Sequence, residues 1–299
     1  MSCYHFIAAE QSHYPVQVLC RVLDVVPSRY YAWYQRQAAA PPEVLTSFEE
    51  AVKEVFYAHH RRYGTRRLRA EFQAQGQRVG RQRLRTALRR LGLRALQPKA
   101  YVPRTTDSTH GQRCAPNLLL EQAPASHANQ VWVSDITYLS LASGNWAYLC
   151  AFQDSFTRQV VGWHVMATMP EELITTALRR ALLARQPAPG LIVHSDRGGQ
   201  YIGQVYKKLL ADAGAQWSQS RKAECLDNAQ AESLWARFKT EELAARPQPY
   251  FADVADARAS VATYFDYYNY ERRHSALAYQ TPQSFYLQQL KNTSLNSPA

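Results

Sequence analysis

Three carboxylates lie in the local settings that two-metal phosphoryl chemistry requires. Asp135 lies inside an alternating apolar run, residues 131–139, which is typical of a strand. Asp196 ends a second apolar run, and Glu232 lies in a stretch with helical character. Two strand ends and a helix could bring the three acids together around two divalent ions, roughly 3.5–4 Å apart, that clamp the attacking and leaving oxygens at phosphorus. Such hard oxygen ligands suit Mg²⁺ or Mn²⁺ rather than zinc.

The spacing of these acids is weak support alone, because the chain has 24 acidic residues and most acids are solvated surface groups. The surrounding motifs carry more weight. They are HSDRGGQY at 194–201, Asp227-Asn-Ala with Glu232-Ser233, and YNYERRHSAL at 268–277 followed by Thr281-Pro282. Together, over roughly residues 60–287, they resemble the bacterial insertion-sequence transposases of the IS-three type. The resemblance is to the second-reading-frame product, which has a retroviral-integrase-like DDE catalytic core.

This resemblance implies a fold, an activity and partners. The expected fold is α/β, a ribonuclease-H-like integrase core with an N-terminal all-α helix-turn-helix DNA-binding region. The expected enzyme is a DDE transposase that uses two Mg²⁺ (or Mn²⁺) ions per site, held by Asp135, Asp196 and Glu232, to cleave and transfer DNA strands. The implied partners are the element's terminal inverted repeats, target DNA, further copies of the chain and a companion first-frame protein, with a copy-out, paste-in route through a circular intermediate.

The net charge of +11 is concentrated in one segment. Residues 61–94 hold twelve arginines, no lysine and a single acid, Glu71, so the remainder of the chain is about neutral. A concentrated arginine stripe is typical of binding to the phosphate backbone of a nucleic acid. The alternative is a solvated helix face, which the preference for arginine over lysine makes less favourable.

A helix–glycine turn–helix pattern over residues 65–91 predicts a helix-turn-helix. Leu84, Leu88 and Leu91 would face its core, which leaves polar side chains outside, where a major groove could be reached. The candidate DNA-binding residues here are Arg66, Arg67, Arg81, Gln82, Arg85 and Arg89. A capping box at Ser47–Glu50 predicts the start of a preceding helix.

The rest of the chain divides around these features. Residues 1–40 are expected to form a short helical segment, 45–97 the helix-turn-helix domain, 98–128 a linker, 129–287 the integrase core with its C-terminal helix, and 288–299 a tail. Within the core, the patterns predict strands at 131–139, 146–154, 158–167, 191–196 and 215–219. Helices are expected from 168 to 185, from 202 to 213, from 227, and from 253 to about 272, which together make a mixed-sheet α/β core.

Several neighbours of the acids have predicted roles. Asn228, Glu232, Trp235 and Lys239 recur at spacings of four, three and four, so they share one helix face. The resemblance places Asn228 and Lys239 along bound DNA, whereas Trp235 is interpreted as core packing. His194 and Arg197 are supporting candidates, with a purely structural histidine equally favoured. Asp154, which ends a strand, is interpreted as structural.

The loop 218–227 is predicted to close over the DNA end. Ala223 and Gln230 stand where relatives tend to have glycine and proline, and Leu226 stands where an aromatic residue is common. These departures touch the loop rather than the acids, so they raise the possibility of a slower enzyme without removing its chemistry.

Composition restricts the other classes of function. No apolar run approaches 18 residues and no secretory signal is visible, so neither a membrane protein nor a secreted one is expected. Five scattered cysteines, never spaced as CxxC, favour free thiols in a reducing cytosol. The family resemblance implies a bacterial cytoplasm, with the protein at the nucleoid. Two alternatives remain: a ribonuclease-H-like nuclease or resolvase that cuts without joining, and a DNA-binding regulator with an inactive core.

Overall fold

The computed structural model describes residues 3–38, 45–97, 114–222 and 224–295. The chain divides into two compact units, Met1–Glu54 and Val55–Ala299. The first unit contains α1 (Cys3–Glu10), α2 (Val16–Val22) and α3 (Pro27–Ala38), which pack around a small core. The sequence predicted a helical segment over residues 1–40, which the structure shows as the helices α1, α2 and α3.

Helix α4 (Ser47–Ala58) begins at the first residue of the predicted capping box, and its observed cap lies one residue earlier. The Thr46 hydroxyl accepts a hydrogen bond from the Glu49 backbone N–H at 3.2 Å, and the Glu49 carboxylate accepts one from the Thr46 N–H at 3.0 Å. The box is therefore Thr46–Glu49 rather than Ser47–Glu50, because Thr46 supplies the same hydroxyl and the glutamate three positions later completes the reciprocal pair.

The predicted helix-turn-helix is present as α5 (Thr65–Ala74) and α6 (Arg81–Arg90). Gly76 and Gly92 follow these helices with φ of +80° and +62°, values that a residue without a side chain adopts at no steric cost. Leu84 and Leu88 are buried as expected, whereas Leu91 is only half-buried, because it caps α6 instead of continuing it.

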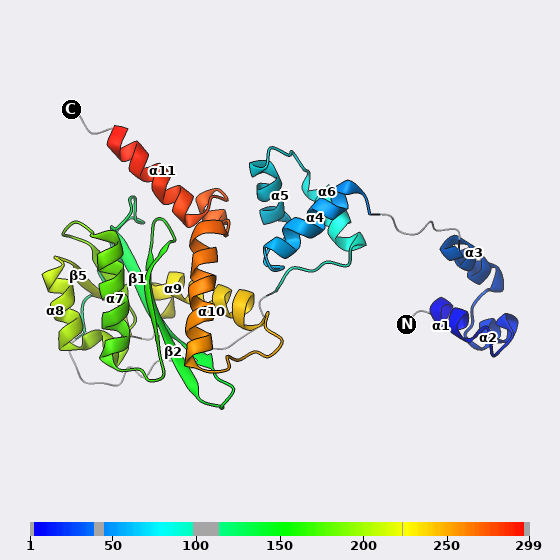
Figure 1. The fold of residues 1–299 in the computed structure, drawn as a ribbon, viewed down its shortest axis with the longest axis horizontal. Helices are drawn as coiled ribbons and strands as arrows, with labels where there is room; N and C mark the ends of the chain where they lie inside the picture. Colours follow the sequence, from blue (N-terminus) through cyan, green and yellow to red (C-terminus); the bar gives the residue numbers. More distant parts are fainter. Residues whose placement is uncertain (1–2, 39–44, 98–113, 223, 296–299) are drawn as a thin grey trace. The chain divides into compact units, whose positions relative to one another are not determined.

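The catalytic core is built on one mixed five-stranded sheet (Figure 1). Its strands are β1 (Val131–Ser140), β2 (Trp146–Asp154), β3 (Val160–Met166), β4 (Ile192–Ser195) and β5 (Gln216–Gln219), in the order β3-β2-β1-β4-β5. The first three strands pair antiparallel, and β4 and β5 add in parallel. All five predicted strands are present, because their alternating and β-branched runs fit a pleated, largely buried surface.

Helices cover both faces of the sheet. On one face lie α7 (Glu171–Arg185) and α8 (Gln204–Asp212), the latter preceded by a 3₁₀ turn at Gly199–Ile202. On the other lie α9 (Ala229–Phe238) and α10 (Val254–Asp266). Gly162 of β3 permits the close approach of α7, because a Cβ at this position would meet the Ala177 carbonyl oxygen at 2.5 Å.

Both helices on the second face continue as a π-helical turn. The turn η3 (Lys239–Leu243) extends α9, and η4 (Tyr267–Glu271) extends α10, so the predicted long helix over 253–272 is present with a change of winding. A 3₁₀ turn, η2 (Cys225–Asn228), precedes α9, which therefore begins two residues later than predicted.

Two predicted boundaries differ from the structure. Residues 115–118, expected as part of a linker, run along β5, where the Leu118 N–H donates to the Ser218 hydroxyl at 3.0 Å. Leu119 packs beside Val131 and Ile192 of the neighbouring strands. The short apolar run 118–120 accounts for this packing. Helix α11 (Pro282–Leu295) extends into the predicted tail, because no glycine or proline interrupts it.

Candidate active site

Parallel pairing of β1 with β4 brings the two predicted aspartates together. In this register Ser134 lies opposite Ser195, so Asp135 and Asp196 each follow one residue later at neighbouring positions of adjacent strands. Both belong to the set of alternate residues that faces α9, because Val131, Val133 and Ile192 pack against Ala231 of that helix. The strand ends thus place two carboxylates on the covered face of the sheet.

Asp135 is the most perturbed acid of the site. Burial raises its pKa to about 8, and the negative charges of Asp196 and, more weakly, Glu232 act in the same direction. Two hydrogen bonds oppose this shift: the Ile136 N–H donates to Oδ1 at 2.8 Å and the Trp235 indole N–H donates to Oδ2 at 3.1 Å. The carboxylates are close enough to repel one another, which is the electrostatic condition that a bound cation relieves.

Asp196 is held by the turn that follows it. The Gly198 N–H donates to Asp196 Oδ1 at 3.0 Å, and a Cβ at Gly198 would lie 3.1 Å from the same oxygen. A glycine therefore lets the backbone approach the carboxylate closely. Gly198 has an ordinary negative φ, so a glycine is favoured because it has no side chain to crowd Asp196, not because of its backbone conformation.

Glu232 lies in the first turn of α9 and its side chain is exposed. Its charge acts on Asp135, which places it in the same electrostatic environment. Within the described ranges, however, no group of three Asp, Glu, His or Cys residues lies close enough to hold a metal ion. The structure thus brings Asp135 and Asp196 side by side and leaves the Glu232 side chain extended toward solvent.

Asn228, predicted to lie along bound DNA, is buried against β1 in the structure. It is 5% exposed, and its side-chain amide donates to the Ser134 carbonyl oxygen at 3.1 Å. Helical spacing identifies residues that share a face, but it did not show that this face is turned onto β1; the DNA contact of Asn228 stays a prediction.

Lys239 is half-buried at the start of η3, on the same face. Burial lowers its pKa, whereas the negative charge of Asp135 acts to raise it. The ammonium group therefore lies within electrostatic reach of the acids. Sequence spacing alone had placed it about two helical turns from Glu232, along the DNA.

The two supporting candidates, His194 and Arg197, form hydrogen bonds to residues 218–220 at the end of β5. His194 is fully buried between the Ser218 and Ser220 hydroxyls, at 2.8 and 3.2 Å, and burial lowers its pKa to about 4. It is therefore a neutral structural histidine. Arg197 donates from Nε to the Ser220 carbonyl oxygen at 2.7 Å, so it positions the loop 218–227.

Asp227, the last residue of that loop, bonds to both the loop and the segment before β1. Its carboxylate accepts hydrogen bonds from Asn117 at 2.9 Å and from Arg221, which holds its pKa at about 2. Ala223 and the side chain of Leu226, two of the departures from the expected pattern, lie outside the described residues. Gln230, the third, bridges Gln153 and Ser155 of the β2 end, so it ties α9 to the sheet.

Asp154 is structural, as interpreted from the sequence. Its carboxylate accepts hydrogen bonds from the backbone N–H groups of Asn129, Phe156 and Thr157, at 2.6, 3.0 and 2.7 Å. These bonds hold the turn after β2 and leave little acceptor capacity for a metal ion.

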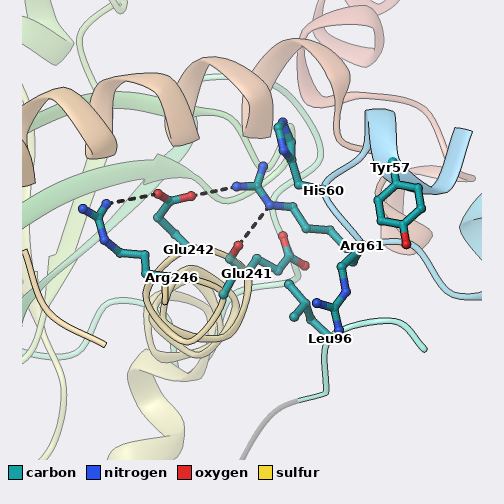
Figure 2. Close-up of a pocket in the computed structure, with 9 residues that line it drawn as sticks. Tyr57, His60, Arg61, Leu96, Glu241, Glu242 and Arg246 are labelled. Atoms are coloured by element: carbon teal, nitrogen blue, oxygen red, sulfur yellow. Dashed lines mark hydrogen bonds and ion pairs between the residues drawn. The ribbon is translucent and has the colours of Figure 1, made fainter. Parts of the chain in front are cut away.

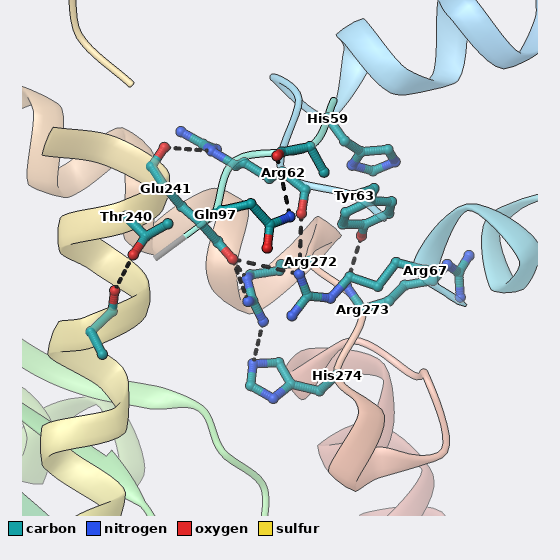
Figure 3. A network of polar contacts seen from close by, with 12 residues as sticks. His59, Arg62, Tyr63, Arg67, Gln97, Thr240, Glu241, Arg272, Arg273 and His274 are labelled. Atoms are coloured by element: carbon teal, nitrogen blue, oxygen red, sulfur yellow. Dashed lines mark hydrogen bonds and ion pairs between the residues drawn. The ribbon is translucent and has the colours of Figure 1, made fainter. Parts of the chain in front are cut away.

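Most of the predicted DNA-binding side chains of the helix-turn-helix are exposed. These residues are Arg66, Arg81, Gln82, Arg85 and Arg89. Arg67 differs, because its guanidinium lies 3.5 Å from the Glu241 carboxylate and donates to the Arg62 carbonyl oxygen at 3.2 Å (Figure 3). The sequence did not predict this ion pair with an acid distant in the chain, and the role of Arg67 as a DNA contact stays a prediction.

Glu241 is the centre of a buried polar network that the sequence did not predict. It is 5% exposed, and Arg272, 1% exposed, donates to it from Nε and Nη2 at 2.7 and 2.5 Å. Arg62 donates to the Glu241 carbonyl oxygen at 3.0 Å. The network joins the start of α5 to the turn that extends α9 (Figure 3). The paired arginines of the motif at 268–277 were the only signal that could have pointed to it.

A cavity of about 350 Å³ opens beside this network (Figure 2). Arg62 and Arg246 form ion pairs with Glu242 there, at 2.7 and 3.9 Å. The positive and negative side chains that line the cavity therefore neutralise one another. None of its lining residues is one of the three predicted catalytic acids. This cavity is therefore separate from the three predicted acids.

The donor set around Asp135 fits a hard divalent cation. Asp135 and Asp196 supply only oxygen ligands, and their repulsion, which adds to burial in raising the pKa of Asp135, would be relieved by positive charge. Such oxygen donors match Mg²⁺ or Mn²⁺. No helix of the described part of the chain is long and apolar enough to cross a membrane.

Comparison with known proteins agrees with this geometry. Models described as integrase core domain match residues 125–225 and 213–282, and one described as HTH-like domain matches residues 46–101. The insertion element IS600 uncharacterized 31 kDa protein of Shigella sonnei is 38% identical over 89% of this chain and 97% of its own length. The transposase InsF for insertion sequence IS3A of Escherichia coli (strain K12) is 35% identical over 94% and 97%.

Among solved structures, a chain of the simian T-cell lymphotropic virus intasome in complex with PP2A regulatory subunit B56 gamma is similar with 14% identity and a TM-score of 0.46, over 83% of this chain and 74% of that one. The integrase core, the HTH-like domain and the two relatives identical at more than 30% over most of the chain confirm the resemblance seen in the motifs. The chain belongs to the IS3 family of insertion-sequence transposases, which are enzymes of the DDE type.

Proposed function

We propose that this chain cleaves DNA at the ends of an insertion sequence and transfers the freed strand to a second site, with Asp135, Asp196 and Glu232 holding two Mg²⁺ or Mn²⁺ ions. The integrase core family depends on divalent metal ions. The observation that carries the proposal is the pairing of Asp135 with Asp196 at adjacent strand positions, within reach of the Glu232 charge. Glu232 is exposed, so its side chain is free to turn toward the aspartates.

The reaction proceeds as two displacements at phosphorus. Water attacks a phosphodiester at the element's end, the bond from phosphorus to the 3′ oxygen breaks, and the products are a 3′-OH and a 5′-phosphate. The 3′-OH then attacks a second phosphodiester, whose own 3′ oxygen leaves, so one phosphodiester replaces another. When bound, the divalent ions would neutralise charge on the attacking and leaving oxygens. No covalent bond to the protein forms, so no serine or tyrosine nucleophile is needed.

The chain's own residues orient this chemistry. Asp135 is fixed at both oxygens, and the Gly198 N–H holds Asp196. Lys239, half-buried beside these acids, is proposed to bind a DNA phosphate next to the scissile one. The loop 218–227, tied to the sheet through His194 and Arg197, is proposed to close over the DNA end.

The exposed face of α6 is proposed to bind the terminal inverted repeats. An HTH-like domain fits DNA as a partner, and Arg81, Arg85 and Arg89 lie on its outer side. We further propose that several copies of the chain assemble on DNA, that a companion first-frame protein takes part, and that the protein acts at the bacterial nucleoid. The name of the InsF relative as a transposase for an insertion sequence supports this reading.

A strand-transfer assay tests the proposal. The protein is incubated with Mg²⁺, DNA carrying the inverted repeats that flank its own gene, and a circular target. The expected products are DNA nicked at the 3′ end of the repeat and joined to the target. Cleavage without joining would instead identify a nuclease or resolvase. Binding without either product would identify a regulator with an inactive core.

A further inference from the structure

Trp235 makes a direct hydrogen bond to a catalytic carboxylate. Its indole Nε1–H donates to Asp135 Oδ2 at 3.1 Å, and its side chain is 5% exposed. The other oxygen, Oδ1, accepts from the Ile136 N–H at 2.8 Å. Each oxygen of an ionised carboxylate has two acceptor positions. The two bonds therefore occupy one position on each oxygen and leave the remaining ones for a cation.

Trp235 also anchors the helix that carries Glu232. Asn228 and Trp235 of this helical segment bond to Ser134 and Asp135, which are consecutive residues of β1. Glu232 lies between these two anchors, four residues after the first and three before the second. At the helical rise of 1.5 Å per residue, each anchor is about one turn from Glu232. The two bonds thus fix both the height and the rotation of α9 against β1.

We infer that Trp235 is a positioning residue for the strand-transfer reaction: its indole N–H orients the Asp135 carboxylate and sets its distance from Glu232. This inference rests on the proposed metal-dependent function of the three acids. Residues that hold a metal ligand in place commonly contribute about 10–100-fold to metal affinity or activity. A hydrogen bond to a charged oxygen is also roughly twice as strong as one between neutral groups.

Packing alone does not account for the Trp235 bond. Trp217 of β5 has a buried indole Nε1 with no hydrogen-bond partner within the described ranges. A buried indole therefore does not need a carboxylate in this fold. Trp217 also provides a matched control, because Trp217→Phe removes an N–H that bonds to no described group, whereas Trp235→Phe removes the bond to Asp135 and keeps an aromatic ring.

The first test measures Mn²⁺ binding to the DNA-free protein by electron paramagnetic resonance titration. We expect Trp235→Phe to weaken Mn²⁺ binding by about 10–100-fold, and Trp217→Phe to leave it unchanged. The Mn²⁺ concentration for half-maximal strand transfer should rise by a similar factor, while the affinity for DNA ends stays at the wild-type value. Trp235→Phe binding Mn²⁺ within twofold of wild type would overturn the inference.

A second measurement uses the unaltered side chain, so it does not depend on how well the variant folds. In a ¹⁵N spectrum of the full chain, the Trp235 indole signal should shift on saturation with Mg²⁺, and Asp196→Asn should abolish that shift. An unmoved Trp235 signal in protein that binds Mg²⁺ would overturn the role of Trp235 alone. Wild-type protein that binds neither Mg²⁺ nor Mn²⁺ would overturn the proposed metal site itself.

Discussion

At the scale of single residues, the acids of the core differ in the hydrogen-bond donors and charges that surround them. Asp154 and Asp227 are surrounded by hydrogen-bond donors, and Arg221 holds the pKa of Asp227 at about 2. Asp135 has the opposite balance, because burial and two neighbouring acids raise its pKa to about 8. Perturbed acids of this kind are typical of functional sites. The surroundings of a carboxylate thus distinguish the structural acids Asp154 and Asp227 from Asp135, which we propose to be catalytic.

Buried His194 predicts a pH dependence of stability. Its pKa is lowered from 6.5 to about 4 by burial, so between these values the unfolded chain binds a proton that the native chain does not. Stability contributed by the neutral histidine is complete above about pH 6.5 and declines as the pH falls toward 4. The loss amounts to roughly 3 kcal/mol, at 1.36 kcal/mol per pKa unit.

The measurement is urea denaturation between pH 7 and 4 for wild type and His194→Gln. The free energy of unfolding of the variant should fall less steeply with decreasing pH, whatever its value at pH 7. Parallel pH profiles for the two proteins would show that His194 is protonated in the native state.

At the residue scale, the sequence predicted which acids meet on the sheet better than it predicted the side chains that contact them. Asp135 and Asp196 were predicted because each ends or interrupts an apolar run, and the parallel register of β1 and β4 then places them together. The buried contacts of Asn228 and Arg67 were not predicted, because helical periodicity shows that residues share a face without showing what covers it. The bond from Trp235 to Asp135 joins residues 100 positions apart, which no local pattern encodes.

At the scale of elements, the extension of α9 links the catalytic helix to the helix-turn-helix. The turn η3 carries Lys239 and, two residues later, the buried Glu241. Burial acts to raise the pKa of Glu241, but hydrogen bonds from Arg272 and the charges of Arg67 and Arg62 keep it below its usual value. Local π-helical winding is frequent at functional sites. It was unpredicted here, because apolar spacing does not separate one extra residue in a turn from a regular helix.

The variant Glu241→Gln tests this network. It keeps the shape of the side chain but leaves Arg272, 1% exposed, without its counter-charge. Breaking a buried pair in this way costs about 3–5 kcal/mol of unfolding free energy. The matched control is Glu242→Gln, whose side chain is 17% exposed and pairs with Arg62 at 2.7 Å. Equal losses in urea denaturation of the two variants would contradict a special role for Glu241.

At the scale of the whole molecule, charge and chemistry occupy different parts of the sequence. The arginine excess lies in residues 61–94, whereas the acids lie on the sheet and α9 of the integrase core. The alternation of strands and helices was enough to predict a mixed α/β core, because each pattern has its own period. The packing of residues 115–118 along β5 was not predicted, because three prolines between 100 and 130 and little apolar periodicity resembled an unpaired linker.

Replacing Arg81, Arg85 and Arg89 together by alanine should weaken DNA binding more than it weakens cleavage. Each DNA phosphate that the variant no longer neutralises should reduce the slope of log affinity against log salt by about 0.9, so affinity for DNA ends should fall and depend less on salt. An arginine that reads a base edge should also cost roughly 1–3 kcal/mol of specificity. Cleavage at high protein concentration should survive better than binding does.

The measurement is a binding titration at several salt concentrations. Arg179→Ala, which removes an exposed arginine from α7, serves as the control and should leave the slope unchanged. If the triple variant keeps the wild-type affinity and slope, the arginine stripe is only a solvated surface.

The most direct test of the three-acid site is Glu232→Gln, measured for end binding and strand transfer on the same DNA. Glu232 is exposed, so the isosteric amide should leave the fold and DNA affinity intact. Because the amide cannot supply the negative charge that a divalent ion requires, cleavage and joining should both disappear, and higher Mg²⁺ should not restore them. A Glu232→Gln protein that binds DNA ends and transfers strands at a near-normal rate would contradict the assignment of Asp135, Asp196 and Glu232 as the catalytic site.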